Sequence, residues 1–591
     1  MFKKLIVKYN LNVHNMLKNG TIAVFTMAGT GILFGDKNIM LAFPVALTSA
    51  VMGRQNFYVK PFSKTIRIMI LDLVIVFMAY LSSINLWVGI IINFFTVFSI
   101  MYMVISPYDL TFYKPFLMLY VFTQYARVSI NELPNRIYSV IFGVAVIAIC
   151  NFIGRSKEKA LLGKTINKSL SILQEQIKNI ENGINDKSIS EKCSNLVRSI
   201  AYRLYVSRHK KYLTTNLGRI QFKIFICIEN INLYLSKIDL RNEEDKNRLA
   251  MISQIINNIT EYLAEEDKQY LLELNDILEK NNCMLNEVED IIRLLVENIK
   301  KLVGLSEKDI NKVYAEWERA SLDRPKTIFF EYLHFNSIRF KFAMRMAITM
   351  SIVLFGCETL GYYKIIWAAI TIMSIMQPYY EDTITKAKDR IRGNIIAVIV
   401  VGISIELIDN KIFTIVVLVV SLYLLYGFKE YSRISLFAAA ASISLASLST
   451  NVNKLIEYRV LYVIVGVILV LIANKLIFPY RLDFGIKELV GKIRRYNNLF
   501  IQDSFAYLED KAEENEIRDL IIHITLLLQK LYIRNKQYKN KEINEFINEN
   551  NKFIMDSGYK VLFAYGKSTE IKDDIASMLK LYKQFNNKII I

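Results

Sequence analysis

Residues 136–151 read RIYSVIFGVAVIAICN, and residues 459–474 read RVLYVIVGVILVLIAN. Both stretches begin with arginine, carry glycine in the middle and end with asparagine, and the second follows the first by 323 positions. The other positions are mostly apolar, and an arginine within lipid costs about 2.5 to 3.5 kcal/mol by insertion scales, so it is rarely kept there without a role. The pattern indicates one membrane unit that is used twice along the chain.

The same offset of 323 positions relates Arg67 to Arg390. Around these arginines each half of the chain offers six apolar segments. We therefore predict an all-α fold: a polytopic membrane protein with two parallel six-helix transmembrane repeats, about 12 spans in all, joined to cytoplasmic helical bundles. The predicted spans are 20–34, 38–53, 67–85, 86–105, 112–127 and 136–154 in the first half, and 343–360, 365–378, 391–408, 411–427, 434–449 and 459–478 in the second.

Composition favours a membrane protein and argues against several other classes. Of the 591 residues 53% are hydrophobic, yet Lys and Arg give a net charge of +19. Positive-inside topology and attraction to anionic lipid explain this excess. Because the aromatic residues lie mostly in the apolar segments, we predict no nucleic-acid partner. The five cysteines form no CxxC pair and the four histidines form no HExxH motif, so we predict no metal site, no cofactor and no enzymatic activity.

Basic residues predict the orientation of the spans. Lys3, Lys4 and Lys8 precede the first span, and a second basic group from Arg54 to Arg67 separates the second span from the third. The positive-inside rule places both groups, and both termini, in the cytoplasm. We therefore predict a multi-pass protein of the plasma membrane. The richness in Ile, Lys and Asn favours a bacterial source, so this is the inner or cell membrane of a bacterium.

Two charged regions alternate with the membrane repeats. In each of them apolar residues recur three and four positions apart, which predicts helices with one buried face. In the central region this stripe consists of Ile166, Leu170, Leu173, Ile177, Ile180 and Ile184, and in the tail of Ile517, Leu520, Ile524, Leu527 and Leu531. The predicted domains are the first transmembrane repeat 1–155, a cytoplasmic helical domain 156–338, the second repeat 339–480 and a C-terminal cytoplasmic helical domain 481–591.

The last span of each half carries candidate binding residues: Arg136 and Asn151 in one, Arg459 and Asn474 in the other. At about 100° per residue the arginine, glycine and asparagine of each span stay on one broad helix face. Two interpretations remain open. In one, the arginine is an interfacial residue above a helix-packing stripe. In the other, it faces a wet cavity and binds a carboxylate through its planar guanidinium group.

Residues 367–394, WAAITIMSIMQPYYEDTITKAKDRIRGN, contain further candidates. Proline after Gln377 cannot continue a regular helix without a break, and a new span is predicted to open at Arg390. Lys386 lies four positions before Arg390 and can share its helix face. These charges form either a solvated cytoplasmic elbow or an electropositive mouth that gathers anions. The candidate substrate-binding residues are therefore Arg67, Arg136, Asn151, Gln377, Lys386, Arg390, Arg459 and Asn474.

A family resemblance follows from the pattern Gln377-Pro378, Glu381, Thr383, Lys386, Arg390 and Gly393. It resembles the signature of the fusaric acid resistance-like (FUSC) family of membrane proteins, which includes aromatic acid exporters. The alternation of membrane blocks and helical blocks is similar to the layout of that family. In the first half the pattern decays, since Arg54 stands in the place of Gln377 and Ile70 in the place of Gly393. The resemblance implies efflux of organic anions without identifying which ones.

Together these features predict a membrane transporter that exports organic anions, such as aromatic or other carboxylic acids, driven by the membrane potential or a proton gradient. Its partners are the small organic anion and membrane lipids, and a homo-oligomer is compatible with the sequence. The alternatives are a non-transporting membrane-anchored scaffold, which binds partners through its cytoplasmic helices, and an anion channel. Asp72 follows Arg67 by five positions and is interpreted either as a neutralising partner of that arginine or as a proton relay.

Overall fold

The chain folds into helices that form two compact units, seen here in a computed structural model. Unit 1 comprises Met1–Ile153 and Leu322–Gly485, and unit 2 comprises Gly154–Ser321 and Ile486–Ile591. Every regular element of the described residues is helical, which confirms the all-α class for this part of the chain. The described residues are 9, 11–52, 61–104, 111–153, 158–184, 187–207, 216–265, 287–305, 333–335, 337–360, 365–408, 410–448, 452–564 and 569–588.

The helices of unit 1 come in two groups along the chain, which we call the first half and the second half. The first half contains α2 (Val13–Phe34), α3 (Asp36–Met52), α4 (Pro61–Ser82), α5 (Leu86–Val104), α6 (Lys114–Tyr125), the 3-10 turn η1 (Ile130–Glu132) and α7 (Leu133–Ile153). The second half contains α16 (Ile338–Thr359), α17 (Ile366–Ile375), α18 (Tyr380–Ala397), the π-helical turn η5 (Val398–Gly402), α19 (Ile403–Ile408), α20 (Lys411–Gly427), α21 (Tyr431–Ser447) and α22 (Val452–Leu476).

Six of the described helical segments are long and apolar enough to cross a membrane. Large apolar side chains such as Phe77 and Trp87 are exposed on their outer faces, a surface that suits lipid and would associate in water. The multi-pass membrane class is therefore supported. The helices α17 and α20 are apolar but shorter than the ~20 residues of a perpendicular span. Length and hydropathy of the described residues thus support six spans, and the predicted twelve are not confirmed. The six are Phe62–Ser82, Leu86–Val104, Ile130–Phe152, Ile338–Thr359, Tyr380–Ile408 and Glu457–Leu476.

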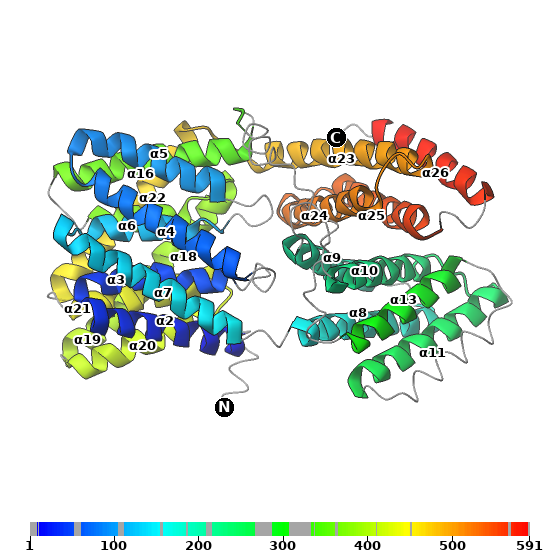
Figure 1. Ribbon diagram of the computed structural model, residues 1–591, viewed down its shortest axis with the longest axis horizontal. Coiled ribbons are helices and arrows are strands. Elements are labelled where there is room, and N and C mark those ends of the chain that lie inside the picture. The colour runs from blue at the N-terminus through cyan, green and yellow to red at the C-terminus, as the bar shows by residue number, and fades with distance from the viewer. Residues whose placement is uncertain are drawn as a thin grey trace. The chain divides into compact units, whose positions relative to one another are not determined.

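The two halves of unit 1 pack against each other reciprocally. The first helix of the second half, α16, lies along α5 of the first half, and the first helix of the first half, α2, lies along α20 of the second. Figure 1 shows these two pairs at opposite edges of the unit. One apolar core, which includes Phe116 and Tyr120 of α6 and Phe342 of α16, runs through both halves.

Glycines in the middle of α7 and α22 allow the close helix approach that the sequence predicts. A Cβ on Gly143 would lie 2.8 Å from Cγ1 of Val45 in α3, and a Cβ on Gly466 would lie 3.0 Å from the backbone oxygen of Ala368 in α17. Such distances leave no room for a side chain. Val45 and Ala368 are themselves 323 positions apart, so both halves use the same contact between their second and last helices.

Helix α18 corrects one prediction, because it begins at Tyr380 and not at Arg390. The backbone of Tyr379 is extended, and Glu381 and Asp382 occupy the first helical turn, where carboxylates interact favourably with the helix N-terminus. The stretch that the sequence suggested as an elbow is therefore helical. Arg390 lies about 15 Å along the helix axis from Tyr380, well inside the segment and not at its mouth.

Unit 2 combines the central and C-terminal charged regions, because α9 packs on α24 and α10 packs on α25. The predicted stripes form its core: Leu170 and Leu173 in α8, and Ile517 and Leu531 in α24, are fully buried. Ile184 does not belong to the stripe and is 54% exposed, because α8 ends at Glu181. The helices of this region are α8 (Glu158–Glu181), α9 (Lys187–Ser207), α10 (Asn216–Leu235), α11 (Glu243–Glu265), α13 (Glu287–Gly304), α23 (Leu482–Leu508), α24 (Glu514–Tyr538), α25 (Lys541–Tyr559), the π-helical turn η6 (Lys560–Ala564) and α26 (Thr569–Lys588).

The basic residues behind the predicted orientation are largely outside the described residues. Lys3, Lys4, Lys8 and Arg54 all fall there. The cytoplasmic location of both termini therefore stays a prediction.

Candidate anion-binding site

Arg459 in α22 is the most deeply enclosed of the predicted arginines in the second half, with 1% of its surface exposed. Its Nε donates a hydrogen bond to Oδ1 of Asn394 in α18 at 3.1 Å. Its guanidinium carbon lies 4.6 Å from the ring centroid of Trp367 in α17, and Nη1 is buried without a partner. The positive charge is thus held by an amide oxygen and an aromatic face, which leaves a donor available for an anion.

Arg390 lies one helical turn before Asn394 on α18 and is 5% exposed. Its Nε has no partner, and its charge repels that of Arg459. Helix α21 comes close on this side because position 393 is glycine: a Cβ on Gly393 would lie 2.8 Å from backbone atoms of α21. Among the described residues neither guanidinium group has a carboxylate within ion-pair distance. Two buried like charges repel each other, and an anion bound near both guanidinium groups relieves this repulsion.

Lys386 and Gln377 extend the positive region toward the start of α18. Nζ of Lys386 donates to Oε1 of Gln377 at 2.9 Å and lies 5.2 Å from the ring centroid of Tyr431 in α21. The hydroxyl of Tyr431 donates to the backbone oxygen of Ser374 at 3.2 Å. Four helices of the second half therefore supply one set of cationic and aromatic side chains, which we call the arginine-pair site: Trp367, Lys386, Arg390, Tyr431 and Arg459.

Asn474 does not lie among the polar contacts of the arginine-pair site. It is fully buried, and its Oδ1 accepts a hydrogen bond from Nη1 of Arg345 in α16. Arg345 also donates to the backbone oxygens of Gln377 at 3.2 Å, Ile477 at 3.0 Å and Phe478 at 2.5 Å. These oxygens lie just beyond the ends of α17 and α22, where helix carbonyls lack partners within the helix. Arg345 therefore ties the ends of two helices to a third.

Sequence reasoning missed Arg345 because the offset of 323 pairs it with Ile22. The sequence nevertheless contained a signal for Arg345. An arginine inside the predicted span 343–360 has the same free-energy cost in lipid as the arginines that the repeat identified.

Asn151 has a related contact in the first half. It is 2% exposed, and its Oδ1 accepts a hydrogen bond from Nζ of Lys18 in α2 at 3.1 Å. Lys18 belongs to the first helix of its half, as Arg345 belongs to the first helix of the second. In both halves a cation from the first helix therefore binds the asparagine near the end of the last helix.

Arg136 in α7 resembles Arg459 in burial, with 1% of its surface exposed. Its Nε donates to Oδ1 of Asn38 at 3.2 Å and its Nη1 to the backbone oxygen of Thr123 at 3.3 Å, while Nη2 has no partner. It also lines a small hollow, with room for about one water molecule. The position that corresponds to Trp367 in the first half is Pro44. Arg136 therefore has no aromatic residue at the place where Arg459 has Trp367.

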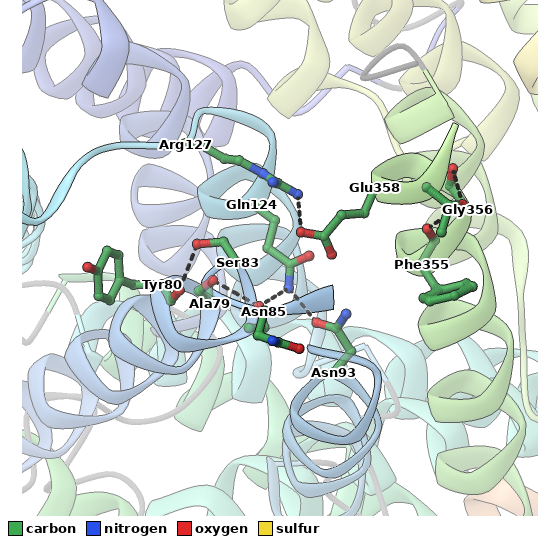
Figure 2. A network of polar contacts seen from close by, with 12 residues as sticks. Ala79, Tyr80, Ser83, Asn85, Asn93, Gln124, Arg127, Phe355, Gly356 and Glu358 are labelled. Atoms are coloured by element: carbon green, nitrogen blue, oxygen red, sulfur yellow. Dashed lines mark hydrogen bonds and ion pairs between the residues drawn. The ribbon is translucent and has the colours of Figure 1, made fainter. Parts of the chain in front are cut away.

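A polar network next to this hollow joins the two halves (Figure 2). Arg127, which lines the hollow, forms an ion pair with Glu358 at the end of α16, at 3.0 Å. Nε2 of Gln124 in α6 donates to Oδ1 of Asn93 in α5 at 2.6 Å. Arg127 thus has a carboxylate partner, which distinguishes it from the buried arginines of the candidate site.

Arg67 is exposed and does not join the other predicted residues. Its counterpart Arg390 is 5% exposed, so α4 and α18 bury different faces. Asp72 differs from its counterpart in the opposite direction: it is fully buried, whereas Ile395 in the second half is 47% exposed. Both carboxylate oxygens of Asp72 lack a partner. The interpretation of Asp72 as the neutralising partner of Arg67 is therefore wrong.

Apolar helices of membrane-spanning length, with arginines buried among them, define a multi-pass membrane protein. Residues 348–473 match the family described as fusaric acid resistance protein-like, which confirms the resemblance predicted from the sequence. The matched residues include all five members of the arginine-pair site, whereas Arg345 and Asn474 lie just outside them. Curated proteins and solved structures gave no significant match.

Proposed function

We propose that this protein is a membrane transporter that exports organic anions, and that the arginine-pair site binds the carboxylate of its substrate. The observation that carries this proposal is that Arg390 and Arg459 are both buried, both retain an unpartnered guanidinium nitrogen, and lie within the segment that matches the family. A carboxylate accepts hydrogen bonds from guanidinium nitrogens with matched geometry. Trp367 and Tyr431 add aromatic faces, which favour aromatic carboxylic acids as the substrate class.

The proposed framework is a pair of six-helix repeats related by a twofold axis along the membrane normal, with twelve spans and both termini in the cytoplasm. Three observations support it. The helix pairs α16–α5 and α2–α20 join the first helix of each half to the fourth main helix of the other. The Gly143–Val45 and Gly466–Ala368 contacts differ by the offset of 323. Each asparagine near the end of a last helix accepts a hydrogen bond from a first-helix cation.

Export by such a site needs no nucleotide. An inside-negative potential drives anions outward by about 2.3 kcal/mol per charge per 100 mV, which corresponds to roughly a fifty-fold gradient of a monovalent acid at about 1.4 kcal/mol per tenfold. The protein has only to lower the barrier to desolvation of the carboxylate. Two arginines that share one anion lower this barrier, and their binding must be weak enough for the anion to leave again.

The test is uptake of aromatic and aliphatic carboxylates into proteoliposomes at a clamped membrane potential, with protein-free liposomes as the baseline. We expect saturable flux that falls sharply in Arg390→Ala and Arg459→Ala. Arg67→Ala is the matched control, because Arg67 has the same side chain at the corresponding but exposed position. Flux that is unchanged in both site variants, with folded protein confirmed by gel filtration, would remove the arginine pair from the pathway.

Two other outcomes separate the alternatives. Single-channel conductance in planar bilayers would identify an anion channel instead of a carrier. Absence of flux for every acid, together with a protein partner retained through unit 2, would favour the scaffold.

A further inference from the structure

Asp72 is the one buried carboxylic acid among the described residues of unit 1. It lies in α4, none of its surface is exposed, and neither carboxylate oxygen has a hydrogen-bond partner. Buried polar groups in proteins nearly always have a partner, so an exception within a membrane helix calls for an explanation.

The protonation state of Asp72 in this conformation follows from the cost of charge. An ionised carboxylate that is buried without a partner carries a large desolvation penalty. A protonated carboxyl group avoids the charge and leaves only an unmet hydrogen bond, which costs less. The neutral form is therefore the stable one here. The proton can leave only in a conformation that brings water or a cation to the carboxyl group.

Other ionisable groups near α4 do not supply such a partner. Helix α4 packs against α5, α6 and α7. Arg67 on α4 itself is exposed, and Arg136 on α7 donates to Asn38 and Thr123. The ionisable residues of these elements are Lys64 and Tyr80 in α4, Tyr102 in α5, Lys114, Tyr120 and Tyr125 in α6, and Tyr138 and Cys150 in α7, besides the two arginines.

The face of α4 that carries Asp72 leads to the hollow beside Arg136. Asp72, Val76 and Ala79 recur at spacings of four and three and are buried, and Ala79 lines that hollow. Asp72 and Ala79 are separated by about 10 Å along the helix axis. Asp72 and this hollow therefore lie along one buried face of α4, and a conformation that extends the hollow along this face would hydrate the carboxyl group.

We infer that Asp72 is a proton-binding site that couples anion export to proton entry. This inference rests on the proposed function and adds the coupling ion to it. The carboxyl group takes up a proton from the outer side when it is hydrated, holds it while it is buried, and releases it on the inner side. With one anion leaving and one proton entering, each cycle moves two positive charge equivalents inward, so the membrane potential and the pH gradient both drive export. The second half has no acid at this place, since its counterpart is Ile395.

The first measurement is the infrared carboxylic-acid C=O band of the purified full-length protein as a function of pH. We expect a band from protonated Asp72 at neutral pH that disappears in Asp72→Asn and persists in Glu406→Gln. Glu406 is an exposed acid near the end of the α18–α19 segment and is the matched control. Identical spectra for the wild type and Asp72→Asn would overturn the proton-binding site.

The second measurement is flux driven by a pH gradient, with the potential held at zero by potassium and valinomycin. The probe is benzenesulfonate, which stays ionised and does not cross the bilayer as a neutral acid. We expect Asp72→Asn to lose pH-driven flux but to keep potential-driven flux, and Asp72→Glu to retain both. Full pH-driven flux in Asp72→Asn would overturn the coupling. Failure of wild-type protein to move any anion at any potential would overturn the proposed function and the coupling, while the infrared band still reports whether Asp72 binds a proton.

Discussion

The two halves of unit 1 share a plan but differ in where their charges lie. Both place a buried arginine near the start of the last helix, with Nε donating to an asparagine side chain at 3.1–3.2 Å. The second half adds Arg390 and Trp367 to its arginine, whereas the first half exposes Arg67 and instead buries Asp72. The difference arises in one element, because α4 and α18 occupy corresponding places and bury different faces.

If the two halves are repeats, as we propose, this contrast shows how they can take different roles. Contacts that hold helices together, such as the glycine contacts and the asparagine–cation contacts, occur in both halves. The buried charged groups differ between the halves: two arginines and an aromatic neighbour in the second half, one arginine and a buried acid in the first. Under our proposals the second half binds the anion and the first half binds the proton. The following predictions compare matched residues of the two halves, from the largest expected effect to the smallest.

The largest difference is expected between Arg345 and Lys18, the first-helix cations. Arg345→Met leaves three buried or partly buried carbonyl oxygens without this donor, each at up to about 1–3 kcal/mol, and is expected to prevent recovery of folded protein. Lys18→Met removes the hydrogen bond to Asn151, and the loss of that bond is expected to cost about 1 kcal/mol. Thermal unfolding in detergent, followed by gel filtration, compares the two. Equal losses of thermal stability in the two variants would mean that the contacts of Arg345 at the end of α22 stabilise the fold no more than the Lys18 contact does.

Arg459 and Arg136 separate transport from stability. Arg459→Ala is expected to lower carboxylate flux by about 10- to 100-fold, because a hydrogen bond to a charged group contributes about 1.5–3 kcal/mol. Arg136→Ala is expected to lower the unfolding temperature, because it removes the contacts to Asn38 and Thr123, and to leave flux per folded molecule nearly unchanged. Flux must therefore be normalised to folded protein. The reverse outcome would assign substrate binding to the first half.

Gly466 and Gly143 test how closely the second and last helices pack in each half. A Cβ at Gly466 meets the backbone oxygen of Ala368 as well as the side chain of Thr371, whereas a Cβ at Gly143 meets chiefly a methyl group of Val45. Overpacking costs about 1–3 kcal/mol, and a side chain can move aside more easily than a backbone. Gly466→Ala is therefore expected to lower the unfolding temperature more than Gly143→Ala. Similar decreases would show that Val45 is as fixed as the backbone of α17.

The sequence was sufficient for the helices, since hydrophobic segments and glycine contacts follow from local composition and a repeat offset. It also singled out Arg390 and Arg459, because an arginine in an apolar span is rare. It could not place Arg67, because the rotation of α4 depends on the packing of neighbouring helices and not on the residues of α4 alone. Likewise the start of α18 depends on Pro378 and the two acids after it, while hydropathy alone places the span ten residues later. Arg345 was missed because the offset pairs it with Ile22, and its contacts to backbone oxygens depend on how the helix ends pack.

The smallest expected effect concerns Trp367, the aromatic face below Arg459. The contact of 4.6 Å is a cation–π interaction worth about 0.5–2 kcal/mol, and it orients the guanidinium group without donating to the anion. Trp367→Leu keeps an apolar side chain and is expected to raise the KM for carboxylates by about two- to tenfold with kcat nearly unchanged, and the rise should be larger for aromatic than for aliphatic acids if the ring also stacks on the substrate. The matched control is Trp87→Leu, because Trp87 is 71% exposed on α5 in the first half. If both variants leave KM unchanged, the ring serves only packing, and the difference between the halves reduces to Arg390 and Asp72.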